Sequence, residues 1–360
     1  MAVSGTMPWW AWLWPALGWA VLAAGAALGL TSLLTAIATA ALMTCVFAAV
    51  YHAEVVAHRI GEPYGTLVLA VAVTVIEVAL IVSVMVAGGP EKATLARDTA
   101  FAAVMIICNG LVGICLLVGG MRHREQDFQL QGALAALAVL AALVTLSLVL
   151  PNVATSSPGP NFSKAQLVFA AVASLVLYGS FVFVQTVRHR DYFLPVGGGT
   201  EDEHAPAPSN AKALVSLGLL VASLVAVVGL AKLLTPSLEV VLEQMSAPKA
   251  FVGIVIAMLV LLPESLSALR AARLNRLQTS MNLALGSALA SIGLTIPAVA
   301  VVSILLDKPL SLGLGSMESV LLALTLFLCG ITLGTGRTTV LQGIVHIVIF
   351  AAFLFFALVP

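Results

Sequence analysis

Long apolar runs separated by short polar turns occupy almost the whole chain. A transmembrane α-helix needs roughly 20 consecutive, mainly apolar residues. Hydropathy, with turns and charges as punctuation, predicts such spans over residues 9–28, 31–56, 65–88, 98–120, 130–150, 165–187, 212–234, 249–269, 280–304, 316–334 and 338–358. The pattern therefore predicts an all-α polytopic membrane protein with about 11 transmembrane helices.

The composition supports a membrane protein and argues against other classes. Of the 360 residues, 61% are hydrophobic and 9% are charged, whereas a soluble domain carries about 25% charged residues. The four cysteines lie in apolar runs without a CxxC spacing, which favours small buried side chains over metal ligands or disulfides. Neither a nucleophile–base pair nor an HExxH motif is apparent, so we do not expect an enzyme. Nucleic acid is not expected among the partners either.

Basic residues divide unequally between the two sides that alternating loops would face. Ten Lys and Arg residues fall on one side and six on the other. The positive-inside rule assigns the richer side to the cytoplasm, which predicts a cytoplasmic N-terminus and an external C-terminus. Because no Lys or Arg precedes Arg59, we expect the first run to be a retained span rather than a cleaved signal peptide.

The two halves of the chain carry one arrangement twice, in opposite orientations. The third and eighth spans each hold one glutamate, and each is followed by a Gly-rich span with scattered polar residues. The pairs lie five spans apart, so an odd number of crossings inverts the second. Inverted repeats of this kind are typical of secondary transporters. We predict an extra N-terminal helix over 1–30, repeats over 31–190 and 212–360, and a cytoplasmic linker over 191–211 with an acidic stretch at 201–204.

The two glutamates, Glu77 and Glu264, are the strongest candidates for chemistry. A charged side chain in hydrocarbon costs roughly 2.5 kcal/mol or more, so its default interpretation is functional. Structural, protonated carboxyls are the alternative, as is an interfacial position for Glu264. Their corresponding places in two similar halves predict one shared cation site. Pro263 predicts an interruption of the eighth span, and Gly286, Gly293 and Pro297 are expected to loosen the ninth.

Polar residues in the spans that follow could complete this site. They are Asn109 in the fourth span, and Asn282 and Ser287 in the ninth. Carboxylate, amide and hydroxyl oxygens suit Ca²⁺, Mg²⁺ or Na⁺ rather than Zn²⁺ or Cu⁺. Hydrogen bonds between helices are the alternative for Asn109 and Ser287. His346, alone in the last span, is expected to be a hydrogen-bonded packing residue, with a proton relay as the alternative.

Competition between a metal ion and protons explains how such a site could exchange them. Burial favours the neutral form of a carboxyl group, and an approaching cation favours the charged form. The same two glutamates can therefore hold either protons or a divalent cation. No resident cofactor is expected, because transported Ca²⁺ and H⁺ would bind only transiently. A passive cation channel is the rival class, and it would conduct without a proton gradient.

Several motifs resemble the bacterial ChaA-type calcium/proton antiporters, a branch of the cation/calcium exchanger superfamily. The motifs in the first half are residues 61–67, 73–77, 97–99 and 105–110, and those in the second are 262–264, 270–273, 275–279 and 282–297.

The resemblance implies 11 spans in two inverted repeats, a bacterial inner membrane and Ca²⁺ export driven by inward proton flow. It also implies that Glu77 and Glu264 are shared Ca²⁺/H⁺ ligands, with Asn109 and Ser287 as helpers. Other branches place a Gly-Asn pair just before each glutamate, and this chain does not. Exchange of Na⁺ or K⁺ for protons is therefore the alternative, and homo-oligomers are possible on either account.

Overall fold

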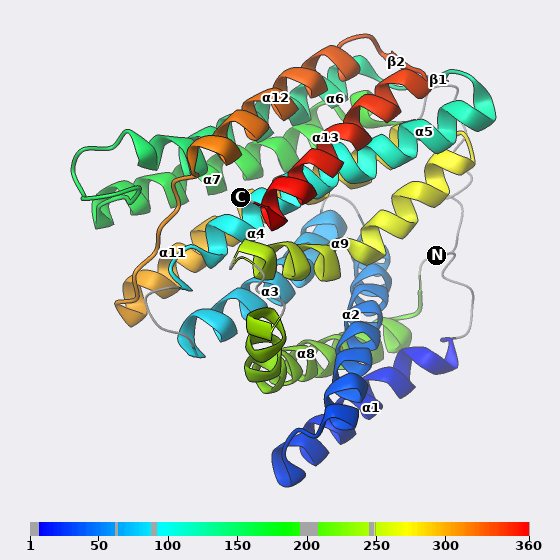
Figure 1. Cartoon of the computed structure of the whole chain (residues 1–360). Coiled ribbons are helices and arrows are strands. Elements are labelled where there is room, and N and C mark those ends of the chain that lie inside the picture. Colours follow the sequence, from blue (N-terminus) through cyan, green and yellow to red (C-terminus); the bar gives the residue numbers. More distant parts are fainter. Residues whose placement is uncertain are drawn as a thin grey trace. The chain divides into compact units, whose positions relative to one another are not determined.

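The computed structural model is almost wholly helical, and it describes residues 7–61, 64–87, 92–194, 208–244, 248 and 250–359 (Figure 1). The acidic stretch at 201–204 lies outside these ranges. Among the described residues, 11 helical stretches are long and apolar enough to cross a membrane. Each begins and ends within four residues of its predicted span. The all-α polytopic fold and the number of spans are thus confirmed.

The chain divides into two compact units, and the first comprises residues 1–92 and 201–247. Its helices are α1 (Trp9–Leu28), α2 (Ser32–Ile60), α3 (Tyr64–Ala87) and α8 (Asn210–Gln244). Helix α2 packs against the other three. Small residues allow this close packing, since a Cβ on Gly18 would lie 2.3 Å from the Cys45 sulfur.

The second unit comprises residues 93–200 and 248–360. Its α-helices are α4 (Leu95–Met105), α5 (Val112–His123), α6 (Leu130–Val144), α7 (Lys164–Phe183), α9 (Ala250–Arg273), α10 (Leu277–Gly293), α11 (Thr295–Leu306), α12 (Ser316–Leu333) and α13 (Val340–Leu358). Its other elements are the π-helices η2 (Ile106–Leu111), η3 (Thr145–Val149) and η5 (Val184–Arg188), the 3₁₀-helices η4 (Leu150–Asn152) and η6 (Arg190–Phe193), and the strands β1 (Gln126–Asp127) and β2 (Arg337–Thr338). The predicted repeats and the compact units divide the chain differently, because each unit draws one segment from each half.

Two spans of the second unit are interrupted, and they differ in part from those expected. The ninth span breaks at Leu294, between α10 and α11, as its glycines and Pro297 predicted. The fourth span contains η2 between α4 and α5. The interruption predicted at Pro263 is wrong, since α9 runs through this residue as one helix. A proline removes a single backbone donor, and membrane helices tolerate that loss where neighbouring groups satisfy the freed carbonyl.

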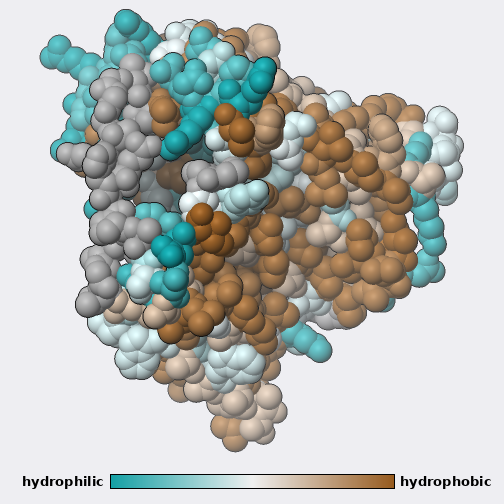
Figure 2. Space-filling model, turned by 180° about the vertical axis from the view of Figure 1, so that it is seen from behind, coloured by the Kyte–Doolittle hydropathy of each residue, from teal (hydrophilic) through white to brown (hydrophobic). Residues whose placement is uncertain are grey.

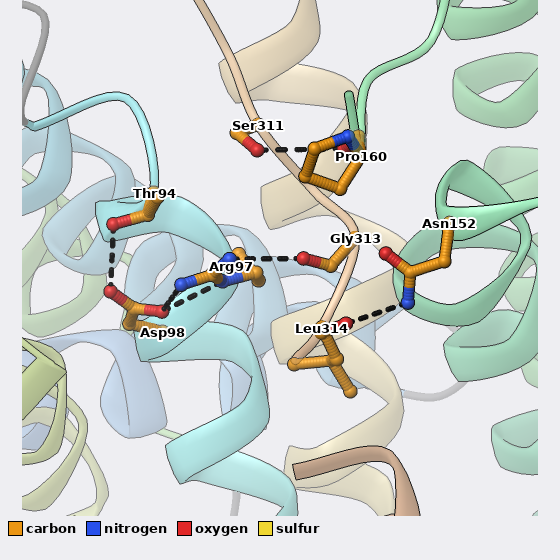
Figure 3. Close-up of polar contacts among 8 residues, drawn as sticks. All are labelled: Thr94, Arg97, Asp98, Asn152, Pro160, Ser311, Gly313 and Leu314. Carbon is orange, nitrogen blue, oxygen red and sulfur yellow. Dashed lines mark hydrogen bonds and ion pairs between the residues drawn. The ribbon is translucent and has the colours of Figure 1, made fainter. Parts of the chain in front are cut away.

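Loop contacts sort the loops of the second unit onto its two ends. At one end β1 and β2 pair in antiparallel fashion, and Asp127 lies 3.1 Å from Arg337. At the other end the loop before α12 is attached to α4 and η4, through Arg97 to the Gly313 carbonyl (2.9 Å) and Asn152 to the Leu314 carbonyl (2.6 Å) (Figure 3). Loops after the fourth and tenth spans therefore share one end. Loops after the third, fifth and ninth share the other, as alternating crossings require.

Apolar side chains form much of the surface. On the face drawn in Figure 2 they make a broad brown area, with hydrophilic residues gathered towards its margins. Phe169 on α7 and Phe327 on α12 are 68% and 65% exposed. A soluble protein rarely exposes so much contiguous apolar surface, so these helix faces suit contact with lipid.

Candidate cation site

Glu77 lies near the middle of α3, in the first unit, and is 2% exposed. Thr74, one turn earlier on the same helix, is also buried. Helix α3 packs against α2 and α8. Intramembrane carboxyl groups that face a bundle interior are characteristic of cation or proton pathways.

Glu264 lies on α9, in the second unit, directly after Pro263. It is partly exposed, in contrast to Glu77. Helix α9 packs against α4, α5, α10 and η2, so its neighbours include the interrupted fourth span and the first part of the ninth. The shared site predicted for the two glutamates stays a prediction, because the two residues belong to different units.

Close packing fixes α9 against α4. A Cβ on Gly253 would lie 2.7 Å from the Asp98 carbonyl carbon and 2.8 Å from the Thr99 nitrogen. Only a glycine permits this approach of two backbones without displacement. The eighth span, which carries Glu264, is therefore positioned by direct contact with the fourth.

Asp98 and Glu318 are acidic residues to which the sequence had assigned no role. Both line a cavity of about 40 Å³ near the first turns of α4 and α12. Asp98 is held by Arg97 (2.8 Å) and by the Thr94 hydroxyl (2.9 Å) (Figure 3). Their signal in the sequence was weak, because acids close to a helix start also occur as ordinary complements of the helix dipole.

Asn109 is completely buried in η2, and both ends of its amide group are hydrogen-bonded. Its Nδ2 donates to the Thr325 hydroxyl (2.8 Å), and its Oδ1 lies 3.1 Å from Nδ1 of His346. An amide oxygen can only accept, so the histidine ring is the donor. Asn109 thus connects three membrane-spanning segments, in agreement with the helix–helix alternative, and its role as a cation ligand stays a prediction. The buried, hydrogen-bonded state expected for His346 is confirmed.

The two candidates on α10 differ in their surroundings. Asn282 donates to the Phe193 carbonyl (2.6 Å) and accepts from Gln278 (2.8 Å), so its side chain attaches α10 to η6. Ser287 is partly exposed, and a Cβ on its neighbour Gly286 would meet no atom within 4 Å. The helix surface at Ser287 is therefore the more open of the two, which suits a group that meets a transported ion.

The chemistry available along these helices is that of oxygen donors. Among the described residues, no group of three or more His, Cys, Asp and Glu side chains is placed to hold a metal ion. The candidates consist of two carboxylates, one hydroxyl and two engaged amides. Such donors suit a hard cation in transit. The carboxylates would be the main groups that replace the water molecules this cation loses.

Comparisons with known proteins point to one family. The family model described as sodium/calcium exchanger protein matches residues 30–187 and 215–359. The Sinorhizobium fredii protein y4hA, whose name assigns it to ionic transport, is 50% identical over 365 residues, which cover 99% of this chain and 98% of y4hA. The sodium-potassium/proton antiporter ChaA of Escherichia coli is 40% identical over 316 residues, covering 87% of this chain and 85% of ChaA.

A solved structure shares the whole fold. The structure of YfkE, named as a Ca²⁺/H⁺ antiporter, superposes with a TM-score of 0.76 at 16% sequence identity, covering 97% of this chain and 100% of YfkE. At such low identity the match shows the fold alone, and the family follows from the sequence comparisons.

Proposed function

Because this chain belongs to the sodium/calcium exchanger protein family of antiporters, we propose that it exchanges Ca²⁺ for protons across a bacterial inner membrane. Glu77 and Glu264 alternately hold the cation and protons. The observation that carries the proposal is the burial of Glu77 at mid-length in α3, with 2% of its surface exposed. An ionised carboxylate at such a position requires a compensating charge, and a proton or a bound cation supplies it.

Antiport follows from competition for the same oxygen atoms. A proton on either glutamate lowers the negative charge available to a cation, and a bound cation stabilises the carboxylates against protonation. The downhill entry of protons can then release Ca²⁺ to the opposite side. Because protons run downhill into the cytoplasm across a bacterial inner membrane, the coupled movement of Ca²⁺ is export.

Calcium is proposed as the cargo because two carboxylates neutralise a divalent charge. Oxygen ligands at flexible positions also suit Ca²⁺ better than Mg²⁺, which demands near-octahedral geometry. The fold shared with YfkE, itself named as a Ca²⁺/H⁺ antiporter, is consistent with this assignment.

Exchange of Na⁺ or K⁺ for protons is the second candidate. It is favoured by the 40% identity with the Escherichia coli protein named as a sodium-potassium/proton antiporter. A monovalent ion requires one carboxylate rather than two. The two candidates therefore differ in whether loss of either glutamate alone abolishes transport.

Proton-gradient dissipation in everted membrane vesicles tests the proposal. Ca²⁺, Na⁺ and K⁺ are added in turn to vesicles that contain the wild type, Glu77→Gln or Glu264→Gln. Glu125→Gln, in an exposed loop, is the matched control. We expect Ca²⁺ at micromolar concentration to dissipate the gradient in the wild type and the control, and neither glutamine variant to respond.

Other outcomes separate the alternatives. A response to Na⁺ or K⁺ alone establishes the second candidate. Cation flux that is independent of the proton gradient indicates a channel. Full exchange by both glutamine variants rules out the roles given to the glutamates.

A further inference from the structure

Four buried polar side chains form a chain of hydrogen bonds within the second unit. It runs from Thr325 on α12 to Asn109 on η2, on to His346 on α13, and back to Thr332 on α12. The successive distances are 2.8, 3.1 and 3.0 Å. All four residues are at most 4% exposed. Buried polar groups carry a high cost when unpaired, so a fully paired chain of this kind specifies one arrangement of its helices.

A single proton arrangement satisfies every bond. The Thr325 hydroxyl donates to the Leu321 carbonyl (2.7 Å) and accepts from Asn109. The Asn109 oxygen accepts from Nδ1–H of His346, so Nε2 of the neutral ring accepts from the Thr332 hydroxyl.

Glycines hold the ring against η2 and α5. A Cβ on Gly113 would lie 3.0 Å from the His346 Cβ, and one on Gly343 would lie 2.5 Å from the Leu117 nitrogen. The backbones of α5 and α13 therefore touch along this line. Helix α13 is otherwise a largely lipid-facing span, since 17% of its apolar stretch is buried within the protein. On its inward face, His346 connects α13 to Asn109 on η2 and to Thr332 on α12.

The segment that His346 holds is in contact with the helices that carry the proposed site. Helix α9 bears Glu264, and α10 bears Ser287, and both pack directly against η2. Interiors are closely packed, so a change in the course of η2 must displace its neighbours.

We propose that His346 is a positioning residue for exchange. Its ring fixes the Asn109 amide and the π-helical turn against α13, and Asn109 acts by setting the course of the fourth span instead of binding the cation itself. This proposal rests on the exchange function proposed above. It gives the last span, remote in sequence from the glutamates, a direct part in transport.

Two substitutions of His346 test the two hydrogen bonds of its ring one at a time. In His346→Asn the side-chain nitrogen can occupy the place of Nδ1, which retains the bond to Asn109. In His346→Gln the terminal group reaches instead to the place of Nε2, which retains the bond to Thr332. We expect the asparagine variant to exchange at close to the wild-type rate, and the glutamine variant to lose about tenfold, the usual scale of one buried hydrogen bond.

A double-mutant cycle then tests whether Asn109 acts through His346. The proteins are the wild type, Asn109→Ala, His346→Ala and the double variant, and the readouts are the maximal rate and the cation KM. We expect each single variant to lower the maximal rate by about tenfold with little change in KM. We expect the double variant to lose less than the product of the two single losses, because both variants remove the bond that Asn109 and His346 share.

Three results would overturn the proposal. The first is a cation KM that rises in Asn109→Ala but not in His346→Ala, together with additive effects of the two substitutions on the maximal rate. That result would make Asn109 a cation ligand. The second is an inactive His346→Asn, and the third is a His346→Gln as active as the wild type.

Thermal unfolding of the same four proteins in detergent gives a readout that needs no cargo. If the wild type moves none of the three cations, the proposed function fails, while the unfolding cycle still decides the coupling of His346 to Asn109. Non-additive shifts in Tm support it, and additive shifts overturn it.

Discussion

Gly253 on α9 meets the backbone of Thr99 on α4 so closely that a single Cβ would lie 2.8 Å from the Thr99 nitrogen. A direct backbone contact therefore helps to place the span that carries Glu264. Any group larger than hydrogen at this position must separate the two helices, and Glu264 lies three turns further along the separated helix.

Substitution of Gly253 should consequently impair both stability and exchange. We expect Gly253→Ala to destabilise the protein by about 1–3 kcal/mol, the usual cost of overpacking, and to reduce the exchange rate. Gly179→Ala on α7 is the matched control, since a Cβ there meets no atom within 4 Å. Thermal unfolding and vesicle transport measure the two effects. Wild-type stability and a wild-type exchange rate in Gly253→Ala would show that α4 and α9 can move apart without consequence.

Arg97 is the second position where one residue holds several segments. Its guanidinium contacts the Asp98 carboxylate at 2.8 Å and donates to the Gly313 carbonyl at 2.9 Å (Figure 3). Removing a partner of a largely buried ion pair leaves an uncompensated charge. We expect Arg97→Ala to destabilise the protein by about 3 kcal/mol and to increase proteolysis of the loop before α12.

Lys164 provides the control for Arg97. It pairs with Asp307 at 3.1 Å, but the two side chains are 75% and 86% exposed. We expect Lys164→Ala to change the stability by less than about 0.5 kcal/mol, because water screens such pairs. Equal losses in the two variants, measured by thermal unfolding, would contradict the importance given to burial.

The sequence predicted those features that depend on hydropathy. A membrane span needs only length and apolar composition, so all 11 stretches were located within four residues. The burial of Glu77 followed from its place in an apolar run, and the break at Leu294 followed from nearby Gly293 and Pro297. The interruption predicted at Pro263 is wrong, because the loss of one backbone donor does not end a helix that its neighbours support.

Other features could not be predicted, because they depend on partners far apart in the chain. The π-helical turn at Asn109 differs from an α-helix by the insertion of one residue, and this leaves the apolar pattern unchanged. His346, the partner of Asn109, lies 237 positions away. The tight contact at Gly343 is likewise a property of two backbones, and a glycine in a span is equally common where nothing approaches it.

Asn282 and Ser287 should give opposite results when truncated. Asn282 bonds to the Phe193 carbonyl and to Gln278, so Asn282→Ala should lower the stability by about 1–2 kcal/mol and leave the cation KM unchanged. Ser287 lies on a more open helix surface, so Ser287→Ala should raise the KM several-fold with little loss of stability. Transport kinetics and thermal unfolding on both variants test this. A raised KM in Asn282→Ala would return Asn282 to the ligand set.

The orientation of the second unit can be tested with two single cysteines at its opposite ends. Glu125 follows the fourth span and Lys308 follows the ninth, and both are exposed. The native cysteines are all buried, which keeps their reaction with aqueous reagents low. If the N-terminus is cytoplasmic, a membrane-impermeant maleimide should label Lys308→Cys in intact cells and Glu125→Cys only in everted vesicles. The reverse pattern would place the C-terminus in the cytoplasm and would overturn the orientation predicted from the basic residues. Labelling of both positions from one side would contradict the odd number of crossings between them.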